Sequence, residues 1–276
     1  MKEELLKQEK LDIIILAGQS NAEGNGKGDT KHPYKRNKNI LHMYDINSYG
    51  YKEDERSKVI HLDIKYPVEF EIDVAEEKTP NGEGGNLGLF FSKMYAKNNL
   101  ENGRKILLIR AAVGGTGFAR GHWGESDVLP KRLNDMVDYA LSLNKENRIV
   151  AFLWHQGEHD AFENTDLDEN TRKNFYYQKL SKFFTNFKNR YNSFSYPIIC
   201  GGIVDSWKKD YSSECRAIED ASKKVMKNIQ GSFVSSKGLK SNNDEIGNGD
   251  PLHFSRDALY IFGKRYYSAY KKLTNK

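Results

Sequence analysis

The chain has 276 residues, 38% of them hydrophobic and 12% aromatic, and 43 basic and 38 acidic side chains give a formal net charge of +5. This length and composition suffice for one large core, and no linker-like stretch divides the chain, so we expect a single domain over residues 1–276. The charges are scattered, whereas a nucleic-acid-binding protein gathers basic residues on one face. Nucleic acid is therefore not an expected partner.

Membrane and metal partners are not expected either. The longest aliphatic run, residues 11–17, is much shorter than the roughly 20 apolar residues of a membrane span, which predicts a soluble protein. Residues 1–7 lack the apolar region of a signal peptide, so we expect a cytoplasmic location, with secretion open if a leader has been removed. Cys200 and Cys215 lack the spacing of metal ligands, and whether they pair is left open.

Aliphatic runs alternate with amphipathic segments along the chain, which is typical of βαβ units and a parallel sheet. Residues 31–85 have few regular patterns and many turn residues, so we expect an irregular excursion on the sheet edge or over the site. In chain order, the predicted strands cover residues 12–17, 40–45, 105–113, 148–155, 197–203 and 232–235. The predicted helices cover residues 87–98, 129–143, 174–191, 215–229 and 256–272.

Polar residues follow three of the predicted strands where each strand ends. They are Gly18-Gln19-Ser20-Asn21, the glycine-rich residues 112–117, and Trp154-His155-Gln156-Gly157-Glu158. Because the carboxyl ends of parallel strands lie along one rim of a sheet, where ligands bind, we expect the three groups to be neighbours in space.

Ser20 admits three interpretations: a phosphate cradle, a cap and a nucleophile. A phosphate-binding P-loop is excluded because Lys27 is followed by Gly28 instead of serine or threonine. A dinucleotide fingerprint is excluded because the glycines after Ser20 are spaced by two residues and do not open a helix. Taken alone, Ser20 and Asn21 are most typical of a helix or turn cap.

A serine nucleophile requires a histidine base and an acid that orients it. Of the seven histidines, His253 lies just before the last predicted helix, with Asp250 three residues earlier, and the intervening turn can fold the carboxylate onto the imidazole. His155 is more typical of a packed core residue, while His122 and His159 could line a site. For residues 249–255 alone, a turn with a helix cap remains an alternative.

An acyl-transfer intermediate also needs hydrogen-bond donors for its oxyanion. The backbone of Gly114 and Gly115 and the amide of Gln156 offer such donors. Each alone could mark a turn or a polar strand end. All of them map to the same rim as Ser20, so the combination predicts a serine hydrolase.

At these residues the chain resembles the SGNH-type hydrolases, and within them the sialate O-acetylesterase and acetylxylan esterase domain of carbohydrate esterase family six. The matching stretches, in the family's order, are LAGQSNAEG (16–24), AVGGT (112–116), WHQGE (154–158) and DPLHFS (250–255). The resemblance implies a flavodoxin-like α/β fold, a three-layer αβα sandwich. It also implies an acetylated carbohydrate as substrate, with no cofactor and no metal.

The resemblance also assigns the site. Ser20 is the expected nucleophile and His253 the base. The expected oxyanion donors are the backbone N–H groups of Ser20 and Gly115 and the amide of Gln156. Two acids, Asp250 and Glu158, are candidates to orient His253, and we expect them to share this task with Asp250 the larger contributor.

The expected activity is removal of O-acetyl groups from carbohydrates, as in acetylxylan esterases, through an acetyl-enzyme on Ser20. A sialate O-acetylesterase and a general short-chain acyl esterase are alternatives. A non-catalytic carbohydrate-binding domain is a further alternative that the intact catalytic residues oppose. The chain departs from relatives at Gly117 and His159, positions that could shape the pocket. The sequence carries no signal of oligomeric state.

Overall fold

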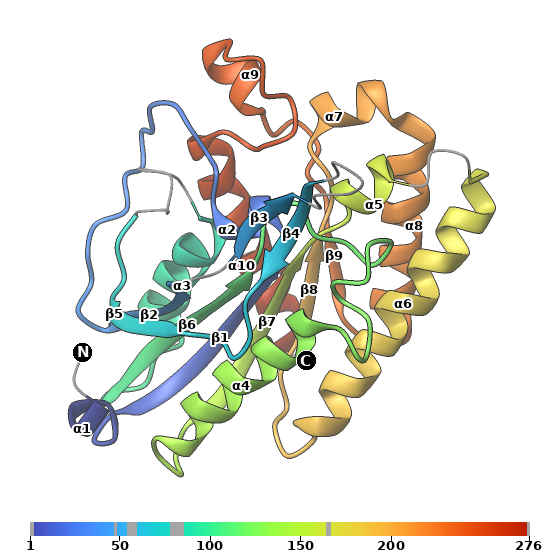
Figure 1. The fold of residues 1–276 in the computed structure, drawn as a ribbon. Helices are drawn as coiled ribbons and strands as arrows, with labels where there is room; N and C mark the ends of the chain where they lie inside the picture. The colour runs from blue at the N-terminus through green and yellow to red at the C-terminus, as the bar shows by residue number, and fades with distance from the viewer. Residues whose placement is uncertain (1–2, 47–48, 54–59, 78–85, 164–166, 275–276) are drawn as a thin grey trace.

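A seven-stranded sheet lies between two layers of helices in the computed structural model, which describes residues 3–46, 49–53, 60–77, 86–163 and 167–274 (Figure 1). The strand order is β5-β2-β6-β1-β7-β8-β9, and every pairing is parallel except that of β5 with β2. The strands are β1 (Lys10–Gly18), β2 (Ile40–Asp45), β5 (Phe70–Val74), β6 (Arg104–Ala112), β7 (Arg148–His155), β8 (Ile198–Gly201) and β9 (Ser232–Val234).

Helices cover both faces of the sheet, as the aliphatic character of β1 requires. Ile14 and Leu16 of β1 belong to the core on one face, and Ile13 and Ile15 to the core on the other, so the strand is buried from both sides. Helices α3 (Leu87–Asn98) and α10 (Arg256–Thr274) cover the first face. Helices α4 (Val128–Ser142), α6 (Glu169–Arg190) and α8 (Ser212–Asn228) cover the second. The predicted three-layer αβα sandwich is therefore confirmed.

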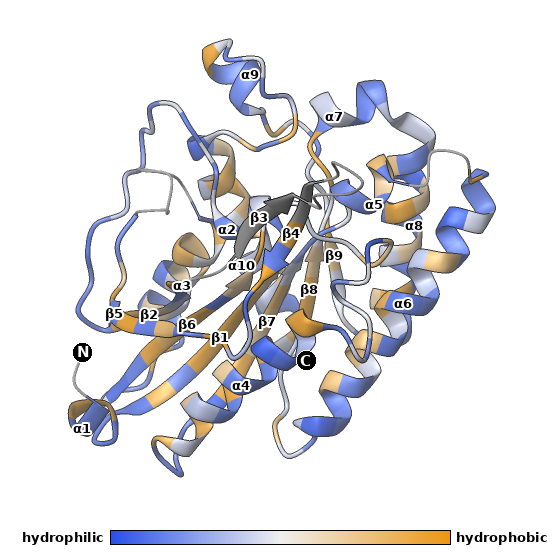
Figure 2. Cartoon of the chain, viewed as in Figure 1, coloured by the Kyte–Doolittle hydropathy of each residue, from blue (hydrophilic) through white to orange (hydrophobic). Residues whose placement is uncertain are grey.

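Hydropathy follows these layers. Figure 2 shows hydrophobic residues along β1, β6 and β7 and many hydrophilic ones on α6. Among the described residues, no helix combines the length and the apolar character needed to cross a bilayer.

The shorter helices are α1 (Glu3–Leu6), α2 (Ser20–Glu23), α5 (Glu158–Phe162), α7 (Asp205–Asp210) and α9 (Asn242–Ile246).

The predicted elements match the observed ones with shifts at their ends. Helix α6 begins at Glu169, five residues before the predicted start at Asn174, because the Asp168 side chain accepts hydrogen bonds from the N–H groups of Asn170 and Thr171. This N-cap satisfies backbone donors that the hydrophobic pattern does not reveal. The two cysteines, Cys200 and Cys215, are both buried and free.

The excursion predicted at residues 31–85 is more regular than expected. It contributes β2 and the antiparallel edge strand β5 to the main sheet, and it forms a separate hairpin of β3 (Tyr49–Glu53) and β4 (Ile60–Ile64). Leu62 and Ile64 of this hairpin pack against the core on the α4 side. Residues 47–48, 54–59 and 78–85 of the excursion lie outside the described part of the chain.

Candidate active site

The three polar groups come together at one rim of the sheet, because β1 lies between β6 and β7 and all three strands are parallel. Strand order reverses around β1, and such a switch point leaves a crevice beyond the strand ends. A cavity of about 430 Å³ opens there. Its described lining residues are Gln19, Ser20, Glu23, Asn25, Gly114, Gly115, Glu158, His159, Phe162, Trp207, Leu252 and His253.

Gly18 lets β1 end directly against β7. Its φ is +139°, and a Cβ at this position would lie 1.9 Å from the carbonyl oxygen of His155. The next residue, Gln19, donates its backbone N–H to that same carbonyl at 3.0 Å. Only glycine fits this close approach, which delivers Ser20 to the first turn of α2 at the rim.

We expect Gly18→Ala to lower the free energy of unfolding by about 3 kcal/mol, since backbone strain and an overpacked contact each cost about 1–3 kcal/mol. Gly103→Ala is the matched control, because Gly103 also has a positive φ (+79°) but a Cβ added there would have no atom within 4 Å. Urea unfolding of both variants checks this. Equal losses at the two positions would show that the contact with His155 contributes nothing.

Ser20, His253 and Asp250 form one hydrogen-bonded chain. Oγ of Ser20 lies 2.9 Å from Nε2 of His253, and Nδ1 of His253 lies 3.0 and 2.9 Å from the two carboxylate oxygens of Asp250. With the Nδ1 proton donated to the carboxylate, Nε2 is left to accept the serine proton. The geometry therefore matches a nucleophile, a base and an orienting acid.

The surroundings of Asp250 keep it ionised. Burial alone would raise its pKa, but hydrogen bonds from His253 and from the amide of Asn242, at 2.8 Å, outweigh burial and lower the pKa of Asp250 to about 2. Asn242 begins the short helix α9, which Ser241 caps. Sequence reasoning missed Asn242, because nothing in its local pattern connects it with the site.

This lowered pKa has a pH signature. Asp250 has an ordinary pKa of 3.8 and a folded pKa of about 2, so its stabilising contribution is present above pH 4, approximately, and is lost as the pH falls toward 2. We expect the stability difference between the wild type and Asp250→Asn to shrink over that window. Urea unfolding of both proteins from pH 5 down to about 2 measures it, and a difference that grows on acidification would contradict the assignment.

Asn21 ties the nucleophile loop to the histidine loop. Its Nδ2 donates to Oε1 of Glu158 at 2.7 Å and to the carbonyl of Leu252 at 3.2 Å, and its Oδ1 accepts the N–H of Phe254 at 3.0 Å. These two backbone contacts flank His253 on both sides. Asn21 thus positions the base relative to Ser20, a role beyond the capping expected from sequence.

Glu158 does not orient His253 by direct contact. It is buried, and its Oε1 is bonded to Nε2 of His155 at 2.9 Å as well as to Asn21. Within the described part of the chain, no hydrogen bond joins Glu158 to His253. The expectation that Asp250 and Glu158 share the orientation of His253 therefore stays a prediction for Glu158. Its side chain turns toward His155, a core residue packed against Phe254.

The expected oxyanion donors are only partly at the cavity. Ser20 and Gly115 line it, but Gln156 does not. The amide nitrogen of Gln156 donates to Oδ2 of Asp160 at 2.7 Å, to the carbonyl of Thr116 at 3.1 Å and to Oε1 of Gln19 at 3.2 Å. Both amide hydrogens are thus directed to buried acceptors in this structure, and the expected role of Gln156 as an oxyanion donor stays a prediction.

Gly117 and His159, the two positions where the chain departs from relatives, lie at or near the cavity. A Cβ at Gly117 would lie 2.7 Å from Oδ2 of Asp160, whose carboxylate accepts the N–H groups of Phe118 and Ala119 and so holds the loop after β6. His159 lines the cavity, and burial lowers its pKa to about 4. It therefore presents a neutral imidazole at neutral pH. His122 contacts Gly117 and does not line the cavity.

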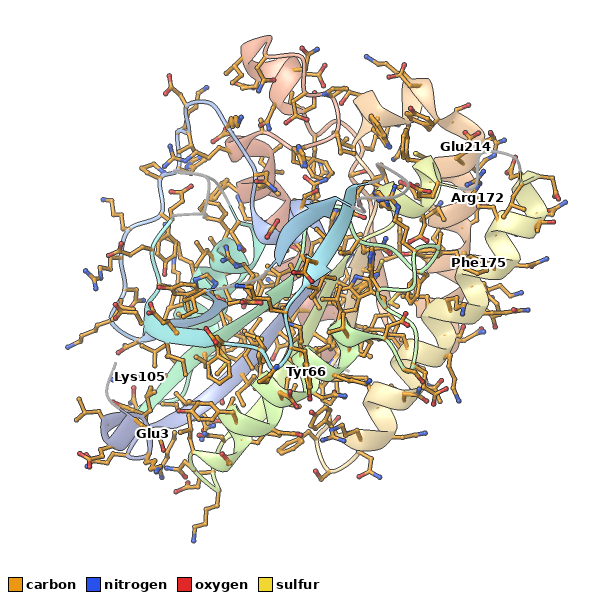
Figure 3. All side chains as sticks on the ribbon, in the orientation of Figure 1. Glu3, Tyr66, Lys105, Arg172, Phe175 and Glu214 are labelled. Atoms are coloured by element: carbon orange, nitrogen blue, oxygen red, sulfur yellow. The ribbon has the colours of Figure 1, made fainter. Side chains whose placement is uncertain are left out.

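Buried Arg172 anchors α5, the helix that begins with Glu158. Arg172, labelled in Figure 3, lies on α6. Its guanidinium donates to the carbonyls of Asp160 at 3.1 Å and Glu163 at 2.6 Å. Cationic groups stabilise the free carbonyls at a helix C-terminus. This contact holds one wall of the cavity in place.

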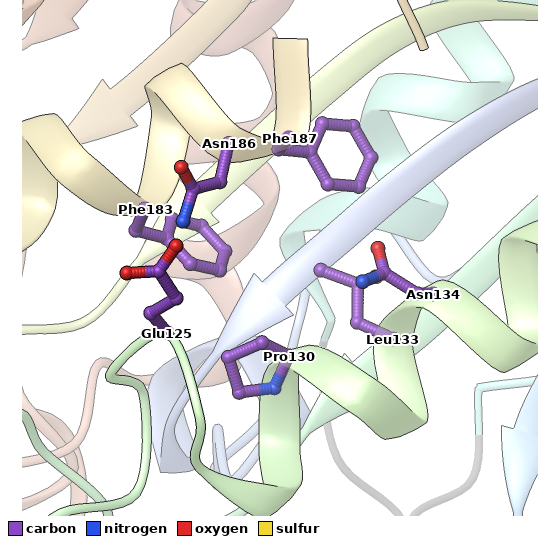
Figure 4. A pocket seen from close by; sticks show the side chains of 7 residues that line it. All are labelled: Glu125, Pro130, Leu133, Asn134, Phe183, Asn186 and Phe187. Atoms are coloured by element: carbon purple, nitrogen blue, oxygen red, sulfur yellow. The ribbon is translucent and has the colours of Figure 1, made fainter. Parts of the chain in front are cut away.

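A second cavity, of about 70 Å³, lies between α4 and α6 (Figure 4). Phenylalanine rings from α6 and Leu133 from α4 contribute to its wall, and its described lining includes neither a histidine nor a serine. It therefore offers no nucleophile and base. Within the described ranges, no group of three or more histidine, cysteine, aspartate or glutamate side chains could hold a metal ion.

The three-layer fold and the serine, histidine and aspartate at its rim define an SGNH-type hydrolase. The sequence profile of one family, described as carbohydrate esterase, sialic acid-specific acetylesterase, matches residues 10–272. The chain belongs to this family. It is therefore a carbohydrate acetylesterase, a carboxylic ester hydrolase.

Solved structures show the same fold at low sequence identity. NanS aligns over 97% of this chain and 98% of its own, with a TM-score of 0.70 and 17% identity. A protein from Arabidopsis thaliana aligns over 95% of this chain and 98% of its own, with a TM-score of 0.68 and 20% identity. A carbohydrate acetylesterase from Xanthomonas citri aligns over 96% of this chain and 56% of its own, with a TM-score of 0.57 and 15% identity. No curated protein sequence matches the chain.

Proposed function

We propose that the protein removes O-acetyl groups from carbohydrates through an acetyl-enzyme formed on Ser20. The observation that carries this proposal is the series of hydrogen bonds from Oγ of Ser20 through His253 to Asp250, of which Ser20 and His253 line the cavity. A serine hydroxyl is a weak nucleophile until a base takes its proton, and His253 is the base within hydrogen-bond distance of Ser20.

In the acylation step, Oγ of Ser20 attacks the acetyl carbonyl carbon while its proton passes to Nε2 of His253. The ionised carboxylate of Asp250 stabilises the imidazolium that forms. The intermediate collapses when the bond between the carbonyl carbon and the sugar oxygen breaks and His253 protonates that oxygen. The sugar leaves as an alcohol, and the acetyl group stays on Ser20.

In the deacylation step, a water molecule gives a proton to His253 and attacks the acetyl carbon. The bond to Oγ of Ser20 then breaks, the proton returns to Oγ, and acetate leaves. Backbone N–H groups of Ser20 and Gly115 are the proposed donors to the oxyanion in both steps. Ser20 opens α2, so its N–H has no acceptor within the helix.

For the substrate we propose an acetylated neutral sugar of the acetylxylan type, with acetylated sialate as the alternative. Phe162 and Trp207 line the cavity and offer aromatic faces to the apolar side of a pyranose ring. Glu23 and Glu158 are the acidic residues there, and the described lining includes no arginine or lysine that could pair with a sialate carboxylate.

Acetate release from a substrate panel tests the proposal. Acetylated xylo-oligosaccharides, O-acetylated sialic acid and an aryl acetate would be compared by kcat/KM with the purified full chain. We expect the highest value among the sugars for the xylo-oligosaccharides. A higher value for the sialate would select the alternative substrate, and no release from any ester would point to a non-catalytic binding domain.

A further inference from the structure

Gln19, the residue before the nucleophile, lies at the cavity wall. It is the N-cap residue of α2, and its side chain makes no capping hydrogen bond. It lines the cavity beside Ser20 and is only 2% exposed. A nearly buried amide normally has partners for both its oxygen and its N–H groups.

The oxygen of the Gln19 amide is identified by its partners. Three N–H donors converge on it: the backbone of His159 at 3.2 Å, the backbone of Gly157 at 3.4 Å, and Nε2 of Gln156 at 3.2 Å. Only a carbonyl oxygen can accept from three N–H groups, so the other end of the amide is the nitrogen.

That nitrogen is available to a ligand. No hydrogen bond within the described part of the chain uses Nε2 of Gln19, and this atom is not among the fully buried polar atoms that lack a partner. It therefore keeps solvent access on a residue that is otherwise buried at the cavity. Two N–H donors fixed next to Ser20 are what a developing oxyanion requires.

Gln156 holds Gln19 in this orientation. Oε1 of Gln156 accepts the hydroxyl of Tyr176 at 2.9 Å, and its nitrogen donates to Asp160, Thr116 and Gln19. Both the oxygen and the nitrogen of the Gln156 amide thus have hydrogen-bond partners inside the protein. Its hydrogen bond to Oε1 of Gln19 fixes the orientation of the Gln19 amide, which makes Gln156 a positioning residue.

We infer that Gln19 supplies the side-chain donor to the oxyanion of the acetyl-transfer intermediate and that Gln156 orients Gln19. This inference rests on the proposed acetyl-enzyme function. It replaces the donor expected from sequence with a residue that lines the cavity and whose amide nitrogen has no hydrogen bond within the described part of the chain. The backbone N–H groups of Ser20 and Gly115 complete the proposed set of donors.

Gln19→Glu is the sharpest variant for a test. The carboxylate keeps an oxygen that can accept from Gly157, His159 and Gln156, but it replaces the donor with a negatively charged oxygen. Since removal of one oxyanion donor lowers kcat about 100- to 1000-fold, we expect at least this loss with an aryl acetate. We expect KM to change little because the contacts of the remaining oxygen persist, and the melting temperature to fall because the charge lies on a residue that is 2% exposed.

Gln19→Met and Gln156→Met make the same chemical change at the two amides. We expect Gln19→Met to lower kcat about 100-fold or more with KM nearly unchanged. Gln156→Met should mainly lower the melting temperature, with a smaller loss of kcat. Gln178→Met, at an exposed position on α6, is the matched control and should match the wild type.

The outcomes separate this inference from the proposed function. If Ser20→Ala is inactive but Gln19→Glu and Gln19→Met turn over within a few-fold of the wild type, Gln19 is not a donor. A larger kcat loss in Gln156→Met than in Gln19→Met would return the donor role to Gln156. If Ser20→Ala stays active, the acetyl-enzyme proposal itself fails.

Discussion

Ser20→Ala is expected to abolish acetate release from an aryl acetate, with a loss in kcat on the order of 10⁶-fold, as for removal of the nucleophile in a serine protease. Alanine has no atom that can attack the carbonyl carbon or carry the acetyl group. The fold should remain, because the change removes only one hydrogen bond, that with His253, which contributes about 1 kcal/mol to stability.

Acetate assays and thermal unfolding of the variant measure both effects. Ser268→Ala is a suitable control, because Ser268 lies exposed on α10. Among the described residues, its hydroxyl donates only to the carbonyl of Lys264. The control should match the wild type in both measurements. Turnover by Ser20→Ala close to that of the wild type would remove Ser20 from the mechanism.

Asp250→Asn is expected to lower kcat by about 10⁴-fold, the loss seen when the acid of a serine protease triad becomes an amide. An asparagine can turn its NH₂ toward Nδ1 of His253, which places the proton on Nε2 and leaves no acceptor for the Ser20 proton. It also removes the negative charge that stabilises the imidazolium. Kinetics with an aryl acetate at neutral pH measure the loss.

Glu158→Gln is the informative comparison for this variant. Because Glu158 reaches the histidine loop indirectly, through Asn21 and through His155 packed on Phe254, we expect a loss of roughly tenfold or less in kcat. We also expect a lower melting temperature from the disturbed contact with His155. A loss near that of Asp250→Asn at an unchanged melting temperature would restore Glu158 as an acid that shares the imidazole. The double variant should then be far worse than either single change.

Local sequence patterns predicted most of the secondary structure, and they singled out the three residues that the fold joins by hydrogen bonds as Ser20, His253 and Asp250. Continuous aliphatic runs such as β1 predict strands buried on both faces, because every side chain in them must leave water. The spacing of Asp250 and His253 is three residues, so a single turn brings them together. Ser20 joins them at long range through tertiary contacts, in which the neighbouring Asn21 binds the backbone of Leu252 and Phe254 on either side of His253.

Tertiary structure alone decided the strand order, the regular pairing of β5 with β2, and the direction of each polar side chain at the rim. The sequence places Gln19, Gln156 and Glu158 at strand ends, but each amide or carboxylate turns toward whichever buried donors and acceptors the neighbouring strands present. Some of those partners are more than 130 positions away in the chain, such as Asn21 for Glu158 and Gln19 for Gln156. Local patterns carry no information about such partners. Only the packed fold shows that Gln19 lines the cavity while the amide of Gln156 is engaged with buried partners.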